Sequence, residues 1–168
     1  CIRDRYIKLL RLGDKFVNLK EAIEDLQTGT KRYKLLVLNQ ESKDCINECK
    51  SLDFEGVVKI DINRLLTEEL LEGKTKEEKE HETWELIKSY LDSLDFKILV
   101  LHDIEYMFSE ELGNLDVIYN FKYYSRNGHI IVLFINAKLI GTNLIYSEEG
   151  CPDYRNMDVS EVDLVGWE

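Results

Sequence analysis

Hydrophobic residues in this chain follow two patterns, short apolar runs and stripes with helical spacing. The runs predict strands at 33–38, 57–60, 96–101 and 129–135. Because these runs are apolar at nearly every position rather than at alternate ones, both faces of the strands must be covered. The pattern therefore predicts a mostly parallel sheet that lies between layers of helices.

Capping residues mark where the predicted helices begin. Asn18 with Glu21, and Thr75 with Glu78, match the capping box, in which a polar side chain accepts a hydrogen bond from a free amide of the first turn. Two short apolar runs near the end of the chain predict edge strands, an arrangement compatible with a terminal hairpin. Helices are predicted at 2–12, 18–28, within 39–50, at 65–70, 75–94 and 115–125, and the edge strands at 144–146 and 162–165.

Strands that alternate with helices predict an α/β fold, a three-layer sandwich with right-handed crossovers. The chain has 168 residues, a length that suits one domain. It contains no internal repeat and no linker-like segment rich in Pro, Gly or Ser. We therefore expect a single domain over residues 1–168, with the N-terminal helices of residues 1–30 packed on it.

Charge and cysteine content narrow the classes of function. The net charge of −11 argues against non-specific nucleic-acid binding, which needs clustered Lys and Arg. No apolar run is long enough to cross a membrane, and the N-terminus lacks the apolar core of a signal peptide. The cysteines and histidines form no paired set with zinc-site spacing, so we expect no metal and interpret the cysteines as structural thiols in a reducing cytoplasm. The cysteines are Cys1, Cys45, Cys49 and Cys151.

Polar residues follow three of the predicted strands, where ligands bind in open α/β sheets. Lys43 stands where the phosphate loop G-x-x-x-x-G-K-S/T has its lysine, but both glycines are absent and Asp44 replaces the hydroxyl residue. Asp103 follows the third strand, where a Walker-B acid holds water on magnesium, and Asn136 follows the fourth, where some P-loop ATPases have a polar sensor. Lys43, Asp103 and Asn136 are the candidate nucleotide-binding residues. The competing interpretation is a plain helix start at Lys43, a capping Asp103 and a turn at Asn136.

The C-terminal segment carries the most specific motif. The run Leu144-Ile-Tyr146-Ser-Glu-Glu-Gly150-Cys151-Pro152-Asp153-Tyr154-Arg155 resembles the ending L-x-Y-x-x-x-G-H-P-E-Y-R of the BrxF family, the small P-loop proteins of BREX-type phage-defence systems. The segment 104–108 is similar to the I-E-x-L-F that follows an acidic strand end in that family. The resemblance spans residues 18–168. Its motif residues here are Tyr146, Gly150, Pro152, Tyr154 and Arg155.

The resemblance implies a P-loop NTPase-like fold and partners among other defence-system proteins. The chain departs from the family in its phosphate loop at 39–45, at His102, which falls where the Walker-B acid stands, and at Cys151, which replaces the histidine. These departures predict a non-catalytic or weakly nucleotide-binding subunit that acts through protein contacts and needs no cofactor. No residue is assigned a catalytic role, and the oligomeric state is left open.

Two alternatives remain open from the residues. One is an active enzyme that uses ATP and magnesium with an atypical phosphate loop. The other is an unrelated α/β regulatory or interaction module that presents an aromatic patch to a partner, although clustered aromatic residues commonly belong to the core. The patch would consist of Tyr119, Phe121, Tyr123 and Tyr124.

Overall fold

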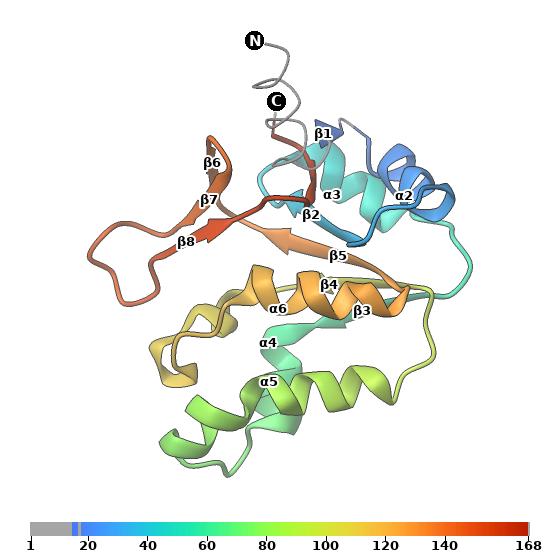
Figure 1. Ribbon diagram of the computed structural model, residues 1–168. Helices are drawn as coiled ribbons and strands as arrows, with labels where there is room; N and C mark the ends of the chain where they lie inside the picture. Colours follow the sequence, from blue (N-terminus) through green and yellow to red (C-terminus); the bar gives the residue numbers. More distant parts are fainter. Residues whose placement is uncertain (1–14, 17, 168) are drawn as a thin grey trace.

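The computed structural model describes residues 15–16 and 18–167. The chain forms a six-stranded sheet and a three-stranded sheet. Helices cover both faces of the larger sheet, and the smaller sheet lies beside it (Figure 1). All neighbouring strands of the large sheet are parallel, which confirms the mostly parallel α/β architecture. Their spatial order is β1 (Lys15–Phe16), β9 (Asp163–Val165), β2 (Leu35–Asn39), β5 (Ile130–Ile135), β4 (Ile98–His102) and β3 (Val57–Asp61).

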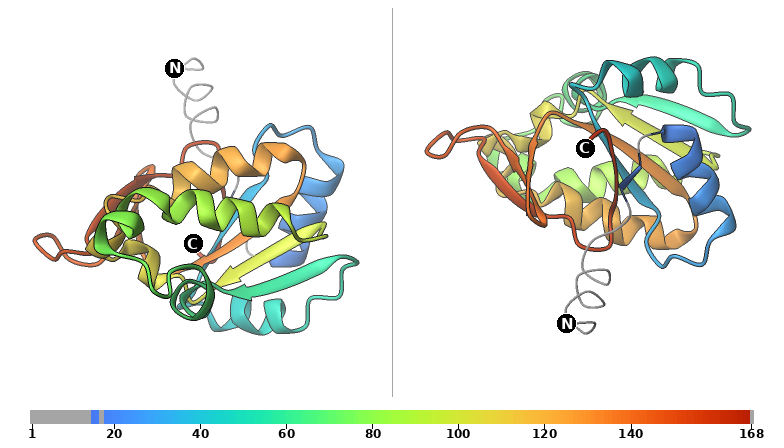
Figure 2. Two further views of the ribbon diagram at one scale, coloured as in Figure 1. Left: turned by 90° about the horizontal axis from the view of Figure 1, so that it is seen from below. Right: turned by 90° about the horizontal axis from the view of Figure 1, so that it is seen from above.

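Helices lie on both faces of this sheet (Figure 2), and a separate apolar cluster covers each face. Successive residues of a strand point to opposite faces, so Leu36 and Leu38 of β2 pack with α2 and α3, whereas Leu35 and Val37 pack with the helices of the other face. Burial on both sides explains the unbroken apolar runs. The helices are α2 (Leu19–Thr28) and α3 (Lys43–Lys50) on one face, and α4 (Ile62–Leu65), α5 (Lys76–Asp92) and α6 (Val117–Tyr124) on the other.

The predicted helix starts are confirmed by their caps. The Asn18 side chain accepts a hydrogen bond from the amide of Glu21 at 3.0 Å, and Thr75 accepts one from the amide of Glu78 at 3.2 Å. Each satisfies one amide that the first helical turn leaves free. The helix predicted at 2–12 lies outside the described residues. No helix in residues 15–16 and 18–167 combines the length and the apolar character needed to cross a membrane.

The prediction of C-terminal edge strands is wrong for residues 144–146 and 162–165, because each run forms an inner strand of its sheet. The strand β9 lies inside the large sheet, between β1 and β2, with Leu164 in register with Val37. The strand β7 (Asn143–Tyr146) instead pairs antiparallel with β6 (Lys138–Ile140) and β8 (Arg155–Asp158) in the small sheet, so the two predicted strands form no hairpin. A run of four residues is too short to distinguish an edge strand from a central one.

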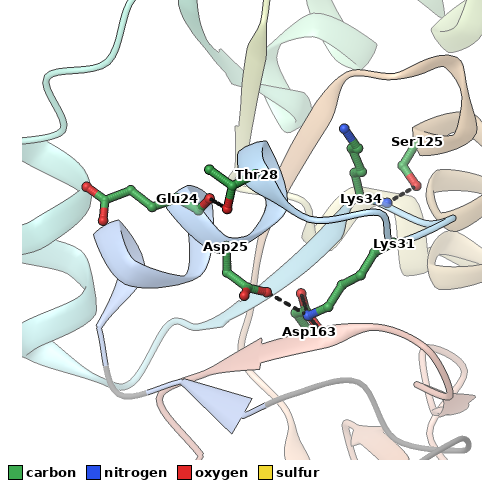
Figure 3. A network of polar contacts seen from close by, with 7 residues as sticks. All are labelled: Glu24, Asp25, Thr28, Lys31, Lys34, Ser125 and Asp163. Carbon is green, nitrogen blue, oxygen red and sulfur yellow. Dashed lines mark hydrogen bonds and ion pairs between the residues drawn. The ribbon is translucent and has the colours of Figure 1, made fainter.

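A buried carboxylate fixes β9 beside β2. Asp163 is 2% exposed, and the Lys31 ammonium lies 2.9 Å from one of its oxygens. Lys31 also forms an ion pair with Asp25 of α2 at 2.9 Å, so one ammonium links the helix to the strand (Figure 3). A buried carboxylate is costly without such a partner. The contact therefore favours insertion of β9 at this position of the sheet.

Candidate functional site

The predicted nucleotide-binding residues lie at one edge of the large sheet, where the parallel strands end. Lys43 is the first residue of α3, which follows β2, while Asp103 directly follows β4 and Asn136 directly follows β5. All three residues are exposed. No hydrogen bond or ion pair joins any two of these three described residues. The conformation of the turn between β2 and α3 therefore decides whether this edge resembles a phosphate site.

The turn between β2 and α3 uses its own backbone amides. The amides of residues 40, 41 and 42 donate to the Ile135 carbonyl at 2.9 Å, the Asn39 side chain at 3.1 Å and the Asn39 carbonyl at 3.1 Å. At the start of α3, the amide of Cys45 donates to the Ser42 hydroxyl at 3.5 Å. A phosphate loop works by turning free amides toward the anion. Residues 40–42 instead form a plain turn with an N-cap, as the helix-start interpretation predicts.

The C-terminal segment covers this turn. The Asn39 side-chain amide donates to the Gly166 carbonyl at 3.0 Å, and the Trp167 indole donates to the Ala137 carbonyl at 3.0 Å. Residues 166–167 thus cross the ends of β2 and β5. Gly166 has φ +93°, and a Cβ atom there would meet the turn at Asn39 Cβ (3.0 Å), Cys45 Sγ (3.1 Å) and Ser42 Cβ (3.2 Å).

The two segments that resemble the BrxF family contact each other. The rings of Phe108 and Tyr146 stack with their centroids 4.2 Å apart and their planes 25° apart. The Arg155 guanidinium donates to the Phe108 carbonyl at 2.9 Å and to the Tyr154 carbonyl at 2.8 Å. Of the other motif residues, Gly150 and Pro152 are exposed in the connection between β7 and β8. Arg155 and Tyr146 therefore attach the small sheet to η2 (Glu105–Phe108), the 3-10 turn that follows β4.

An acidic and aromatic cleft of about 610 Å³ lies along this junction. Its charged lining residues are all carboxylates, and it has two tyrosines. The pKa of Tyr146 is raised, mainly by burial and further by the negative charges of Glu105 and Asp153. Burial and the hydrogen bond to Glu111, at 2.7 Å, raise the pKa of Tyr106 to about 12. The cleft is lined by Asn63, Thr67, Glu105, Tyr106, Ser109, Glu110, Tyr146, Pro152 and Asp153.

A second polar cluster, which the sequence interpretation missed, lies where β3 and β4 end. Asp61 and His102 are paired in register on these neighbouring strands, and Asp103 follows. His102 Nδ1 lies 2.7 Å from Asp103 Oδ2. One ligand atom from each residue lies within 4.8 Å of those of the other two. Polar residues at the ends of two consecutive strands were the available signal, but the sequence does not say that these strands are neighbours.

The predicted aromatic patch is only partly exposed. Phe121 and Tyr124 are buried in the core, and the Tyr124 hydroxyl donates to Asp92 at 2.8 Å. Tyr119 and Tyr123 are 56% and 40% exposed. These residues lie on α6, whose 3.6-residue period turns two of them inward and two outward. The prediction of a four-residue surface patch is therefore wrong, and the exposed aromatic surface on α6 consists of Tyr119 and Tyr123.

Neither protein-family models, nor curated proteins, nor solved structures match this chain. The functional argument therefore depends on the geometry of the strand ends and of the cleft.

Proposed function

We propose that this protein is a small P-loop-like subunit of a BREX-type antiviral defence system, and that it acts through protein contacts without turning over a nucleotide. The scaffold is that of a P-loop NTPase, the partners are other defence-system proteins, and the compartment is the cytoplasm. The resemblance of segments 104–108 and 144–155 motivates the assignment, and the junction between these segments supports it.

The order of the strands supports the choice of scaffold. The strand that precedes the phosphate-loop position, β2, is central, and β5 separates it from β4, which precedes the Walker-B position. Asn136 at the end of β5 therefore follows the strand that lies between those preceding Lys43 and Asp103, as a site shared by these three residues requires. The agreement is one of architecture, and architecture alone does not define an activity.

The observation that carries the proposal is the closed turn at residues 39–42. The amides of residues 40–42 are bonded within the protein, and Gly166 lies so close to the turn that a Cβ atom there would come within 3.0–3.2 Å of Asn39, Ser42 and Cys45. A triphosphate there would have to break these hydrogen bonds and displace residues 166–167. The active-enzyme alternative, with Lys43, Asp103 and Asn136 around ATP and magnesium, is correspondingly disfavoured.

The acidic cleft is the surface that we assign to the partner. Its carboxylates Glu105, Glu110 and Asp153 and its tyrosines match the chemistry of a segment rich in Arg and Lys, which forms charge-assisted hydrogen bonds and stacks on aromatic rings. The net charge of −11 would steer such a segment toward the protein. The occupant is therefore a basic segment of a larger defence component.

Calorimetry with ATP and magnesium tests the absence of a nucleotide site. We expect no binding heat from the wild-type chain, and the same flat titration from Lys43→Ala. Micromolar affinity that Lys43→Ala abolishes would show an open phosphate site and overturn the proposal.

Co-expression with neighbouring defence proteins tests the partner assignment. The double variant Glu110→Lys/Asp153→Lys should weaken co-purification at least about tenfold, because it reverses two charges of the cleft. The matched control, Glu72→Lys/Glu85→Lys, makes the same change in net charge at exposed positions outside the lining and should co-purify like the wild type. A wild-type chain that stays alone contradicts the proposal, and so does a cleft variant that binds as well as the control.

A further inference from the structure

The strand ends of β3 and β4 bring together three side chains that ligate metals. Asp61 ends β3, His102 ends β4 in register with it, and Asp103 follows. The only ion pair that the structure gives any of these three described residues is the one within the group, between His102 and Asp103 at 2.7 Å. The carboxylates of Asp61 and Asp103 lie within 4.8 Å of each other, and the nearby Arg64 guanidinium is paired with Glu68. Two such carboxylates are stabilised by a cation.

We propose that Asp61, His102 and Asp103 bind one divalent transition-metal ion. Carboxylate oxygens and an imidazole suit Mn²⁺, Fe²⁺, Co²⁺ or Zn²⁺, whereas Mg²⁺ and Ca²⁺ prefer oxygen ligands alone. Ligand atoms bond such an ion at about 2.0–2.2 Å, so two of them lie at most about 4.4 Å apart. In this structure the ligand atoms all lie within 4.8 Å of one another. Because none of the three side chains is buried, small rotations about their side-chain bonds bring the ligand atoms into range.

A pocket beside the three ligands supplies an independent reason to place a ligand here. Its volume is about 290 Å³, and His102 and Asp103 form part of its wall. Gln40, which follows β2, lines the same pocket. The pocket therefore offers room, next to two of the three ligand residues, for the further ligands that a bound ion needs.

The chemistry of the pocket fits the coordination positions that three protein ligands leave open. The pocket has an apolar wall formed by Ile46, Val100 and Phe134. Lys59 also lines the pocket, and its ammonium donates to the Cys49 carbonyl at 3.1 Å. The apolar wall limits how much water enters the pocket, and the nearby Lys59 ammonium favours binding of an anion there. The ligands that complete the coordination are therefore water and a small carboxylate- or phosphate-bearing molecule.

The metal site shares the Walker-B position at Asp103 with the magnesium site of a P-loop protein but differs from it in its other ligands. Magnesium in that fold needs the hydroxyl that follows the phosphate-loop lysine, and here that residue is Asp44 on α3. The proposed ligands come from β3 and β4, and β5 lies between β4 and β2. Metal binding therefore needs no nucleotide and no protein partner, and its test is independent of the proposed function.

Titration of the purified chain with Mn²⁺, followed by the electron paramagnetic resonance signal of the free ion, tests the site. Co²⁺ absorption reports whether nitrogen and oxygen ligands surround the ion. The variants are Asp61→Asn, His102→Ala and Asp103→Asn. Asparagine at 61 keeps the helix cap that Asp61 provides to the amide of Arg64, and asparagine at 103 tolerates the backbone φ of +50°. Folding is checked by circular dichroism, and His81→Ala, an exposed histidine on α5, is the control.

We expect one Mn²⁺ per chain, an affinity at least about tenfold lower in each ligand variant, and no change in His81→Ala. The Co²⁺ spectrum should change in His102→Ala. Absence of binding up to about 1 mM Mn²⁺ would overturn the proposal. Binding that the three variants leave unchanged would overturn it equally, because the ion would then lie elsewhere.

Discussion

Gly166 tests whether the C-terminal segment really closes the phosphate position. Gly128 is a matched reference, because both glycines have φ +93° but, among the described residues, none beyond its chain neighbours comes within 4 Å of a Cβ atom at 128. Alanine at either position costs about 1–2 kcal/mol for the left-handed backbone. Alanine at 166 must also push against Asn39, Ser42 and Cys45, with contacts of 3.0–3.2 Å. Such overpacking costs about 1–3 kcal/mol more.

Urea unfolding followed by circular dichroism measures the two costs side by side. With a slope of about 2 kcal/mol/M, an extra 2 kcal/mol lowers the unfolding midpoint of Gly166→Ala by about 1 M relative to Gly128→Ala. The slope itself should not change, because the same surface is exposed on unfolding. Equal midpoints for the two variants would refute the reasoning. They would mean that residue 166 is not packed against the turn and that the phosphate position is open.

Two further predictions concern contacts that hold the fold and the cleft together. Lys31→Met removes the ammonium beside the buried Asp163 and should lower the free energy of unfolding in urea by about 2–3 kcal/mol. The loss is smaller than for a fully buried pair because the Lys31 side chain is 32% exposed. A loss below about 0.5 kcal/mol, the level expected of the exposed control Lys20→Met, would contradict this prediction. The pKa of Tyr106 is raised from 10.0 to about 12, so the stabilisation by its protonated hydroxyl is complete below pH 10 and is lost as the pH rises through about 12. The free energy of unfolding is therefore measured at about pH 9 and about pH 11. It should fall less between these pH values in Tyr106→Phe than in the wild type or in the control Tyr119→Phe. Equal losses in all three proteins would show that the Tyr106 hydroxyl does not form the hydrogen bond described.

The polar candidates show how far strand ends can be found without a structure. Lys43, Asp103 and Asn136 were located correctly at one edge, because parallel strands all end on the same side of their sheet. Asp61 was missed as a partner of His102. The identity of the neighbouring strands depends on hydrogen bonding between segments far apart in the chain, and the residues at the strand ends do not encode it.

The small sheet shows the same limit for motif residues. The resemblance marked segments 104–108 and 144–155 separately, and nothing in either segment indicates that the rings of Phe108 and Tyr146 stack or that Arg155 reaches the Phe108 carbonyl. The cleft exists only because these segments meet. Its acidic character could be foreseen from composition, whereas its location could not.

The amino-acid sequence by itself determined the class of the fold and the helix starts. Unbroken apolar runs can be satisfied only by strands covered on both faces, and capping side chains act within three residues of their own position, so both signals are local. Tertiary structure decided where β9 inserts, which residues cover the β2–α3 turn and which carboxylates face His102. Those outcomes depend on the balance among long-range pairings, such as Lys31 with Asp163, and a run as short as 162–165 has too few contacts of its own to fix its neighbours.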